Sequence, residues 1–174
     1  MSQSPPRFVC CPPDSIPMVK EIGVEYIAAY QTSILRNFPV GHVALQLKAN
    51  VRKSGIRPST TAWDFCSIAM AVAAVDEAVP RNVTADGWTR MLHLEVHLCE
   101  PLIWDGQREK LERILRFLTG DYWRISFQGG GDEPPKPQTP KSYRADCVSL
   151  LSGGLDSLVG AIDLQNAGRS PLFI

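Results

Sequence analysis

A stretch rich in glycine and proline divides this chain of 174 residues into two unequal parts. In "GGGDEPPKPQTPK", residues 129–141, three glycines and four prolines favour neither a strand ladder nor a continuous helix. We therefore expect an exposed linker over 129–144. An α+β domain over 1–128 would precede it, and a second domain would begin at residue 145.

Hydrophobic periodicity before the linker predicts both strands and helices. Apolar and polar side chains alternate, as in half-buried strands, over 43–51 and 90–101, and 122–128 reads as a further strand. Helices are expected over 61–79, with Thr60 and Thr61 as cap candidates, and over 105–118, from a cap at Asp105 to a stop at Gly120. The first helix is apolar nearly all round, which predicts that it is buried. Residues 21–38 fit either state.

Composition points to no charged partner. Lys plus Arg and Asp plus Glu number 18 each, so the chain lacks the basic excess typical of nucleic-acid binding. The apolar run at 68–75 is too short to span a bilayer, and the first residues do not resemble a secretory signal. Five scattered cysteines fit reduced thiols, so we expect a cytoplasmic protein without a membrane partner.

The part after the linker has the order strand, glycine loop, helix, strand. An apolar run at 145–152 precedes the glycines, a helical pattern follows over 155–168, and "SPLFI" at 170–174 begins another strand. This order predicts a βαβ unit with a parallel sheet.

The glycine loop, Ser152-Gly153-Gly154-Leu155-Asp156-Ser157, has the composition of an anion site. Glycines permit positive φ and close approach of a ligand, and a helix N-terminus offers N–H groups and partial positive charge to a phosphate. The serine hydroxyls would donate to phosphate oxygens. Asp156 would hold the loop, cap the helix or bind a Mg²⁺ ion that phosphates share. Neither the Walker pattern nor the dinucleotide fingerprint is present.

"SGGLDS" after an apolar strand resembles the pyrophosphate loop of the ATP pyrophosphatase (PP-loop) superfamily. The resemblance implies a HUP-like α/β domain that splits ATP, with Mg²⁺, between its α and β phosphates and adenylates a substrate. It assigns ATP or pyrophosphate binding to Ser152, Gly153, Gly154, Leu155, Asp156 and Ser157. A tight strand–helix turn without a ligand is the alternative interpretation of the same six residues.

Upstream, "AWDFCSIAMAVAAVDEAVPR", "GWTRMLHLEVHLCEPLIWD" and "LRFLTGDYWRISFQ" resemble the N-terminal extension of QueC-like proteins, the 7-cyano-7-deazaguanine synthase family, from bacterial anti-phage loci. This looser resemblance implies adenylation of a 7-deazaguanine carboxylate, an amine nucleophile, and a protein partner in a defence complex. The family's zinc-binding cysteine cluster has no counterpart in this sequence. No catalytic residue is carried over.

The sequence stops at Ile174, within the second strand of the expected βαβ unit. Such a chain would be the N-terminal fragment of a longer enzyme and inactive alone. Two other functions stay open: a protein- or tRNA-binding module that retains a remnant loop, and another PP-loop enzyme such as a tRNA thiolase or an amide synthetase.

Three smaller patterns have plainer interpretations. Polar residues on one strand face, His93, Glu95, His97 and Cys99, could converge on zinc, but a solvated strand face is the preferred interpretation, and we assign no metal site. The four tryptophans, Trp63, Trp88, Trp104 and Trp123, are expected in the core. A mild basic cluster, Lys48, Arg52, Lys53 and Arg57, is expected to be a solvated loop.

Overall fold

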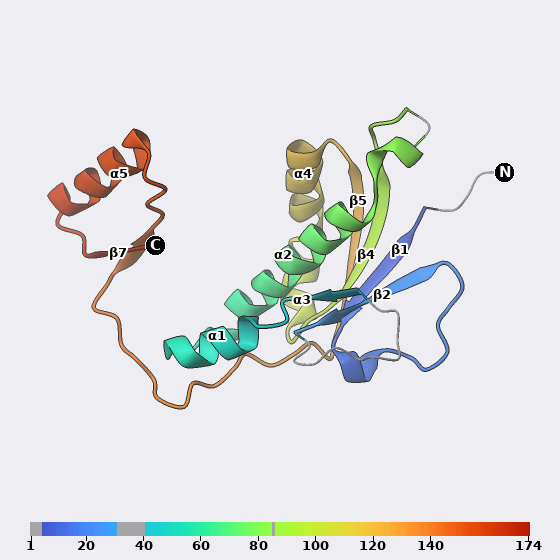
Figure 1. Cartoon of the computed structure of the whole chain (residues 1–174), viewed down its shortest axis with the longest axis horizontal. Coiled ribbons are helices and arrows are strands. Elements are labelled where there is room, and N and C mark those ends of the chain that lie inside the picture. The colour runs from blue at the N-terminus through green and yellow to red at the C-terminus, as the bar shows by residue number, and fades with distance from the viewer. Residues whose placement is uncertain (1–4, 31–40, 85) are drawn as a thin grey trace. The chain divides into compact units, whose positions relative to one another are not determined.

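The computed structural model describes residues 5–30, 41–84 and 86–174 (Figure 1). Its internal contacts separate the chain into two compact units, Met1–Gln138 and Thr139–Ile174. We call them unit 1 and unit 2 and describe each by itself. None of the described helices is long and apolar enough to cross a membrane.

A five-stranded sheet forms the centre of unit 1, and its four described pairings are all parallel. The strands lie in the order β3-β2-β1-β4-β5. They are β1 (Arg7–Cys11), β2 (Val24–Ala29), β3 (Gly41–Val43), β4 (Met91–His97) and β5 (Tyr122–Gln128). The mixture of helices and strands expected for this part of the chain is therefore present, and its sheet is of the parallel type found in α/β folds. From β1, the chain adds β2 and β3 on one side of the sheet and then β4 and β5 on the other side, so the direction in which strands are added reverses between β1 and β4.

Helices cover one face of this sheet. They are α1 (Leu47–Ser54), α2 (Thr60–Ala78), α3 (Pro101–Asp105) and α4 (Arg108–Thr119), and Figure 1 shows α2 and α4 on the same side. Alternate strand residues point to that side and pack against the helices: Phe8, Cys10, Ile27, Ala29, Leu92, Leu94, Val96, Trp123 and Ile125. This cluster is the hydrophobic core of the unit, because parallel strands depend on burial of their faces.

The opposite face of the sheet has much less cover. Beneath the β1–β2 connection, Val9, Cys11, Val24 and Tyr26 form a small second cluster against Ile16. Strands β4 and β5 present polar side chains there instead: His93, Glu95, His97, Arg124 and Ser126. The two faces of one parallel sheet therefore differ in chemistry as well as in cover.

The strand predicted over 43–51 is wrong. Strand β3 ends at Val43, the chain turns at Ala44 with φ +59°, and α1 begins at Leu47. The alternation misled because Leu47 and Val51 are four residues apart, a spacing that also places two side chains on one helix face. Both side chains pack against the core from α1.

The helix predicted over 61–79 is confirmed as α2, but its cap and its burial differ from the prediction. Ser59, not Thr60 or Thr61, is the N-cap, and its Oγ accepts a hydrogen bond of 3.1 Å from the Ala62 N–H. The helix is buried along one face only, and Phe65 on another face is 53% exposed. Alanines make its solvent side apolar in sequence while exposing little apolar area.

The later elements match the predictions more closely. Leu92, Leu94, Val96 and Leu98 are buried on one side of β4 and the residue after it, and β5 spans the expected 122–128. Helix α4 stops at Gly120, which has φ +76°, as predicted. It begins at Arg108 rather than 105, because Pro101 starts the separate short helix α3, which ends at Asp105.

Part of the expected linker, residues 131–135, contacts unit 1. Gly131 donates a backbone hydrogen bond of 3.1 Å to the Leu98 carbonyl, just past the end of β4. Lys48 of α1 forms an ion pair of 2.6 Å with Asp132, and Pro135 is buried. These contacts hold the segment 131–135 against unit 1, whereas Gly129 and Gly130 are exposed as expected of a linker.

Gly131 is expected to be intolerant of any side chain. A Cβ at this position would lie 2.5 Å from Leu98 backbone atoms, which have no room to yield, whereas nothing lies within 4 Å of a Cβ at Gly129. Gly131→Ala should lower the free energy of unfolding by about 1–3 kcal/mol or detach the segment. Denaturant unfolding and limited proteolysis after residue 128 measure the two effects. Equal behaviour of Gly129→Ala would contradict this account.

A buried ion-pair network joins the end of α2 to the start of β4 and β5. Arg90 is 3% exposed and Asp121 is fully buried, and they pair at 2.6 Å. Arg90 also donates to the Asp76 and Val79 carbonyls at 2.8 and 2.7 Å and pairs with the Asp76 carboxylate. Arg81 reaches the same Asp121 carboxylate at 3.0 Å. Each buried charge therefore has partners, as burial of an ion requires.

Asp121→Asn should destabilise unit 1 by about 3–5 kcal/mol, because it removes the fully buried counter-ion of Arg90 and leaves the guanidinium only the half-exposed carboxylate of Asp76. Equilibrium urea unfolding measures the loss. Glu21→Gln is the matched control, since its exposed 3.5 Å pair with Arg7 should contribute at most about 1 kcal/mol.

The pH dependence of this difference identifies its cause. Burial alone would raise the pKa of Asp121, but hydrogen bonds from Arg90, the charge of Arg90 and a hydrogen bond from Arg81 outweigh it and hold the pKa below its ordinary value. The stabilisation is therefore present above the ordinary aspartate pKa of about 4. It is lost as pH falls through the lower folded-state pKa. A gap between wild type and Asp121→Asn that stays constant down to pH 2 would contradict the ion-pair account.

Candidate functional site

The glycine loop lies in unit 2 between a strand and a helix, as predicted. Unit 2 contains β6 (Cys147–Ser149), α5 (Leu155–Asn166) and β7 (Pro171–Phe173). The two strands pair in parallel, with Val148 opposite Leu172, so the segment is a βαβ unit. The residues from Ser152 to Ser157 therefore occupy the junction from which a parallel strand enters its crossover helix.

The backbone conformation of the loop requires glycine at position 153 but not at position 154. Gly153 has φ +81°, a region that residues with a Cβ rarely adopt, so the turn itself requires glycine there. Gly154 is the N-cap of α5 with φ −81° and ψ 159°, an extended conformation open to any residue. A Cβ on Gly154 would meet only the Ser152 Oγ, at 3.7 Å. Local structure thus leaves the choice of glycine at 154 unexplained.

The two serines of the loop face each other. Ser152 Oγ donates to Ser157 Oγ at 3.3 Å, and Ser157 Oγ donates to the Gly154 carbonyl at 2.8 Å. Ser152 and Gly153 are exposed, and Ser157 is partly buried. Both hydroxyls thus lie beside the entrance to α5, where an anion could compete for their hydrogen bonds.

The N-terminus of α5 has no side-chain cap. In any helix the N–H groups of the first turn have no carbonyl partner within the helix. The cap residue here, Gly154, has no side chain that could accept a hydrogen bond from them. In α2, by contrast, the Ser59 hydroxyl takes one of these N–H groups. Asp156 lies in the first turn of α5 and is exposed, and its carboxylate makes no hydrogen bond or ion pair with the described residues. The amides and this carboxylate are therefore available to a ligand.

Asp146 organises unit 2, a role that sequence reasoning missed. Its carboxylate accepts a 3.0 Å hydrogen bond from the Ser170 N–H and pairs at 3.0 Å with Arg169. Hydrogen bonding within the turn, first from Cys147, holds the pKa of Asp146 below its ordinary value. The only signal in the sequence is an acidic residue directly before an apolar run.

Apolar side chains of unit 2 are largely exposed, and Ala161 is its only buried apolar residue. Exposed fractions reach 73% at Leu150 and 74% at Leu155. The other exposed aliphatic residues are Val148, Leu151, Leu158, Val159, Ile162 and Ile174. Because parallel strands and their crossover helices are normally buried, these side chains mark a surface suited to contact with further protein.

The possible zinc ligands on β4 do not converge. His97 Nε2 lies 3.6 Å from Glu95 Oε1, while the Cys99 thiol donates at 3.2 Å to the Asp132 carbonyl. Within the described ranges, no three His, Cys, Asp or Glu side chains could hold a metal ion together. Burial, and then Asp64, raises the pKa of Cys99 to about 11, so its thiol stays protonated at neutral pH.

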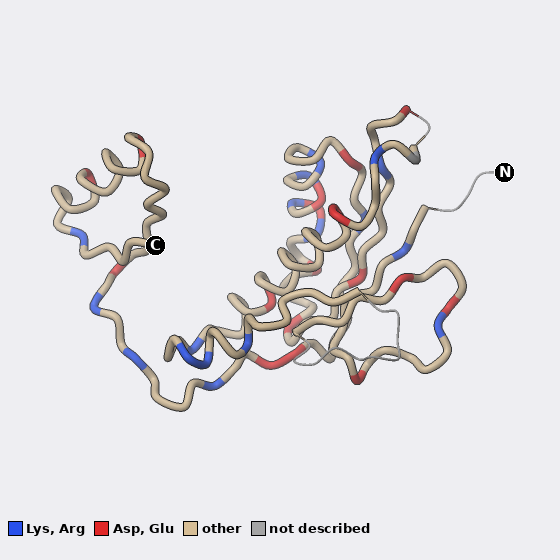
Figure 2. Tube along the Cα trace, in the orientation of Figure 1, with Lys and Arg blue, Asp and Glu red and all other residues tan. Residues whose placement is uncertain are grey.

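The remaining predictions are only partly confirmed. Trp63, Trp104 and Trp123 are buried as expected, but Trp88 is 65% exposed, so the core prediction is wrong there. The basic cluster lies mostly on α1, where Lys48 pairs with Asp132. Figure 2 shows Lys and Arg interspersed with Asp and Glu along the tube rather than gathered in one run.

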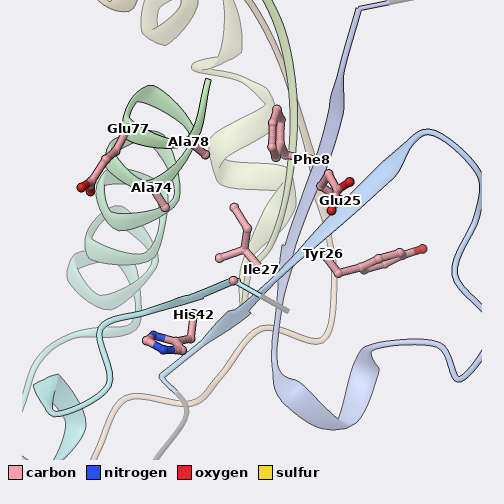
Figure 3. A pocket seen from close by; sticks show the side chains of 9 residues that line it. Phe8, Glu25, Tyr26, Ile27, His42, Ala74, Glu77 and Ala78 are labelled. Carbon is pink, nitrogen blue, oxygen red and sulfur yellow. The ribbon is translucent and has the colours of Figure 1, made fainter. Parts of the chain in front are cut away.

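A cavity of about 540 Å³ lies between α2 and the edge of the sheet at β2 and β3. Figure 3 shows Phe8 and Ile27 on the sheet facing Ala74 and Ala78 on α2. Its polar groups, Glu25, His42 and Glu77, make no hydrogen bond to one another in the described part of the chain. The hollow is thus largely apolar and brings no reactive pair together.

Comparison with known proteins identifies no relative: no family model, curated protein or solved structure matches this chain. The site must therefore be judged on its own geometry. What the fold defines is a parallel-sheet protein with a strand–glycine loop–helix junction.

Gly153 and Gly154 should respond differently to alanine. Gly153→Ala forces a Cβ into a left-handed conformation and should cost unit 2 about 1–2 kcal/mol. It should therefore speed amide hydrogen exchange in β6 and α5. Gly154→Ala meets no such strain and should leave exchange almost unchanged. Equal acceleration by both substitutions would contradict the loop geometry.

Proposed function

We propose that the loop Ser152–Ser157 binds the pyrophosphate part of ATP and that the chain belongs to an ATP pyrophosphatase of the PP-loop type. The observation that carries this proposal is the uncapped N-terminus of α5, placed directly after the positive-φ residue Gly153. Exposed backbone N–H groups at a helix start suit a phosphate chain, and the helix dipole adds to their attraction. Ser152 and Ser157 add two hydroxyl donors beside them.

The proposal explains why residue 154 is glycine, which the fold alone does not explain. Its dihedral angles do not require glycine, so the absence of a side chain is explained if a ligand approaches the backbone there. The same argument distinguishes the loop from a turn that merely joins a strand to a helix.

The Asp156 carboxylate is suited to bind the Mg²⁺ ion that accompanies ATP. Its carboxylate is exposed in the first turn of α5 and makes no bond to the described residues. Mg²⁺ is commonly held by one or two carboxylates together with substrate phosphates. When bound, the ion would neutralise charge on the phosphates, while the loop N–H groups and hydroxyls orient them.

For the reaction, we propose adenylation of a 7-deazaguanine carboxylate with release of pyrophosphate, as in QueC-like enzymes. Support comes from the sequence upstream of the loop, which resembles QatC of the Qat anti-phage system. A carboxylate oxygen would attack the α-phosphate of ATP, and the bond to the β-phosphate would break, so that pyrophosphate leaves. An amine would then displace AMP from the acyl-adenylate.

ATP–pyrophosphate exchange on the protein as the cell produces it tests this function. With a 7-deazaguanine carboxylate present, exchange should be measurable and should fall about 10²-fold or more in Gly154→Ala and Asp156→Ala. Loss in Gly154→Ala with normal hydrogen exchange in α5 would assign the effect to the ligand. Asp163→Ala, on the same helix beyond its first turns, is the control. Absence of exchange with every carboxylate, or full exchange in both variants, would overturn the proposal.

A further inference from the structure

A cavity of about 400 Å³ lies on the less covered face of the unit 1 sheet. Its wall combines three strands with α4, which passes the free edge of β5, where Glu112 Oε1 accepts a 2.8 Å hydrogen bond from the Ile125 N–H. The polar side chains around it are Arg7, His93, Glu95, Arg108, Glu112, Arg124 and Ser126. The cavity belongs wholly to unit 1 and includes no part of the glycine loop.

Three of these side chains form a straight row across the sheet. Arg7 on β1 is opposite His93 on β4, and His93 is opposite Arg124 on β5. Neighbouring strands are about 4.8 Å apart, and like charges on directly opposed residues repel. The row places a guanidinium group on each side of the imidazole, an arrangement that disfavours a charged imidazole and attracts an anion.

The protein supplies only part of that negative charge. Arg7 pairs with Glu95 at 3.1 Å and with Glu21 at 3.5 Å. The side chain of Arg124 makes no hydrogen bond or ion pair with any described residue. Arg108 has only an exposed pair of 3.5 Å with Asp105, outside the cavity lining.

The charges of the lining do not cancel. Three arginines oppose the two carboxylates of Glu95 and Glu112 within the lining, and the exposed Glu21 and Asp105, outside it, pair with Arg7 and Arg108. Glu112 is already an acceptor for a backbone N–H of β5. Arg124 and Arg108 are thus the cations with coordination capacity to spare.

The pKa of His93 is affected by the positive charges around it. Burial, then Arg124, then Arg7 lower its pKa below the ordinary value. At neutral pH the imidazole is therefore uncharged and has one N–H to donate, and the Ser126 hydroxyl lies on the same face. Guanidinium groups combined with neutral donors are the set that proteins use for tetrahedral oxyanions.

We propose that this cavity binds the phosphate group of a small molecule, held by Arg124 and Arg108 with His93 beneath it. A cavity of this size falls in the range of small-molecule sites, so it has room for the body of a phosphate ester as well. The site is independent of the glycine loop and of the function proposed for it.

NMR of the ¹⁵N-labelled full chain tests this, because His93 is one of only three histidines. Inorganic phosphate and AMP are titrated separately at constant ionic strength. Either should shift the His93 imidazole signals saturably, with half-saturation at or below about 1 mM. Tighter binding of AMP would show that the ligand is an ester, and equal binding that free phosphate suffices. No saturable shift with either compound would overturn the proposal.

Variants establish where the anion binds. Arg124→Gln should weaken binding about tenfold or more, and Arg124→Lys should restore part of it. Arg113→Gln removes the same charge from α4 outside the cavity lining and should change the affinity less than about twofold. Asp156→Ala, in the loop, should leave the His93 shift unchanged. Equal weakening by Arg124→Gln and Arg113→Gln, or loss of the shift in Asp156→Ala, would overturn the site.

Discussion

The buried pair of Arg90 and Asp121 is the interaction on which the arrangement of unit 1 depends. Arg90 precedes β4 and Asp121 precedes β5, so the pair fixes the amino ends of two neighbouring strands together. The same guanidinium binds carbonyls at the end of α2, Asp76 and Val79. A single buried cation thus joins the sheet to its main covering helix. Apolar contacts alone could not fix the orientation of the helix on the sheet, because hydrophobic burial is non-directional.

The other end of α2 is attached to β4 by a second buried charge. Asp64, 1% exposed in the first turns of α2, accepts hydrogen bonds of 2.9 Å from the N–H groups of Cys99 and Glu100, just after β4. Helix and strand are therefore held at both ends, with Ile68, Ala71 and Val75 packed between. The apolar contacts provide the driving force for association, and the two charged groups specify its register.

Sequence reasoning found the elements whose pattern has one interpretation. Strands β4 and β5, helices α2 and α4, and the βαβ order around Gly153 follow from periodicity and from glycine at stops and turns. It missed β1, the central strand, because "FVCC" is buried on both faces and too short to show any period. It also missed the rows of the sheet: Arg7, His93 and Arg124 are remote in sequence, and only the register of three strands brings them together. For the glycine loop, the sequence indicated all six positions, whereas the conformational difference between Gly153 and Gly154 needed coordinates.

Both units leave part of a parallel sheet without helical cover, but the chemistry of the uncovered surface differs. In unit 1 it carries arginine, histidine and glutamate side chains, which water solvates well, and a helix-covered opposite face supplies the core. In unit 2 the uncovered side chains are leucine, isoleucine and valine, and Ala161 alone is buried. Exposure of several large apolar side chains on one βαβ unit forgoes about 1.5–3 kcal/mol for each that could be buried, a large amount beside the net stability of a domain. The charged face of unit 1 can therefore persist in water and receive a soluble anion. In unit 2, burial of the exposed apolar side chains against further protein would stabilise the strand–helix junction that carries the glycine loop.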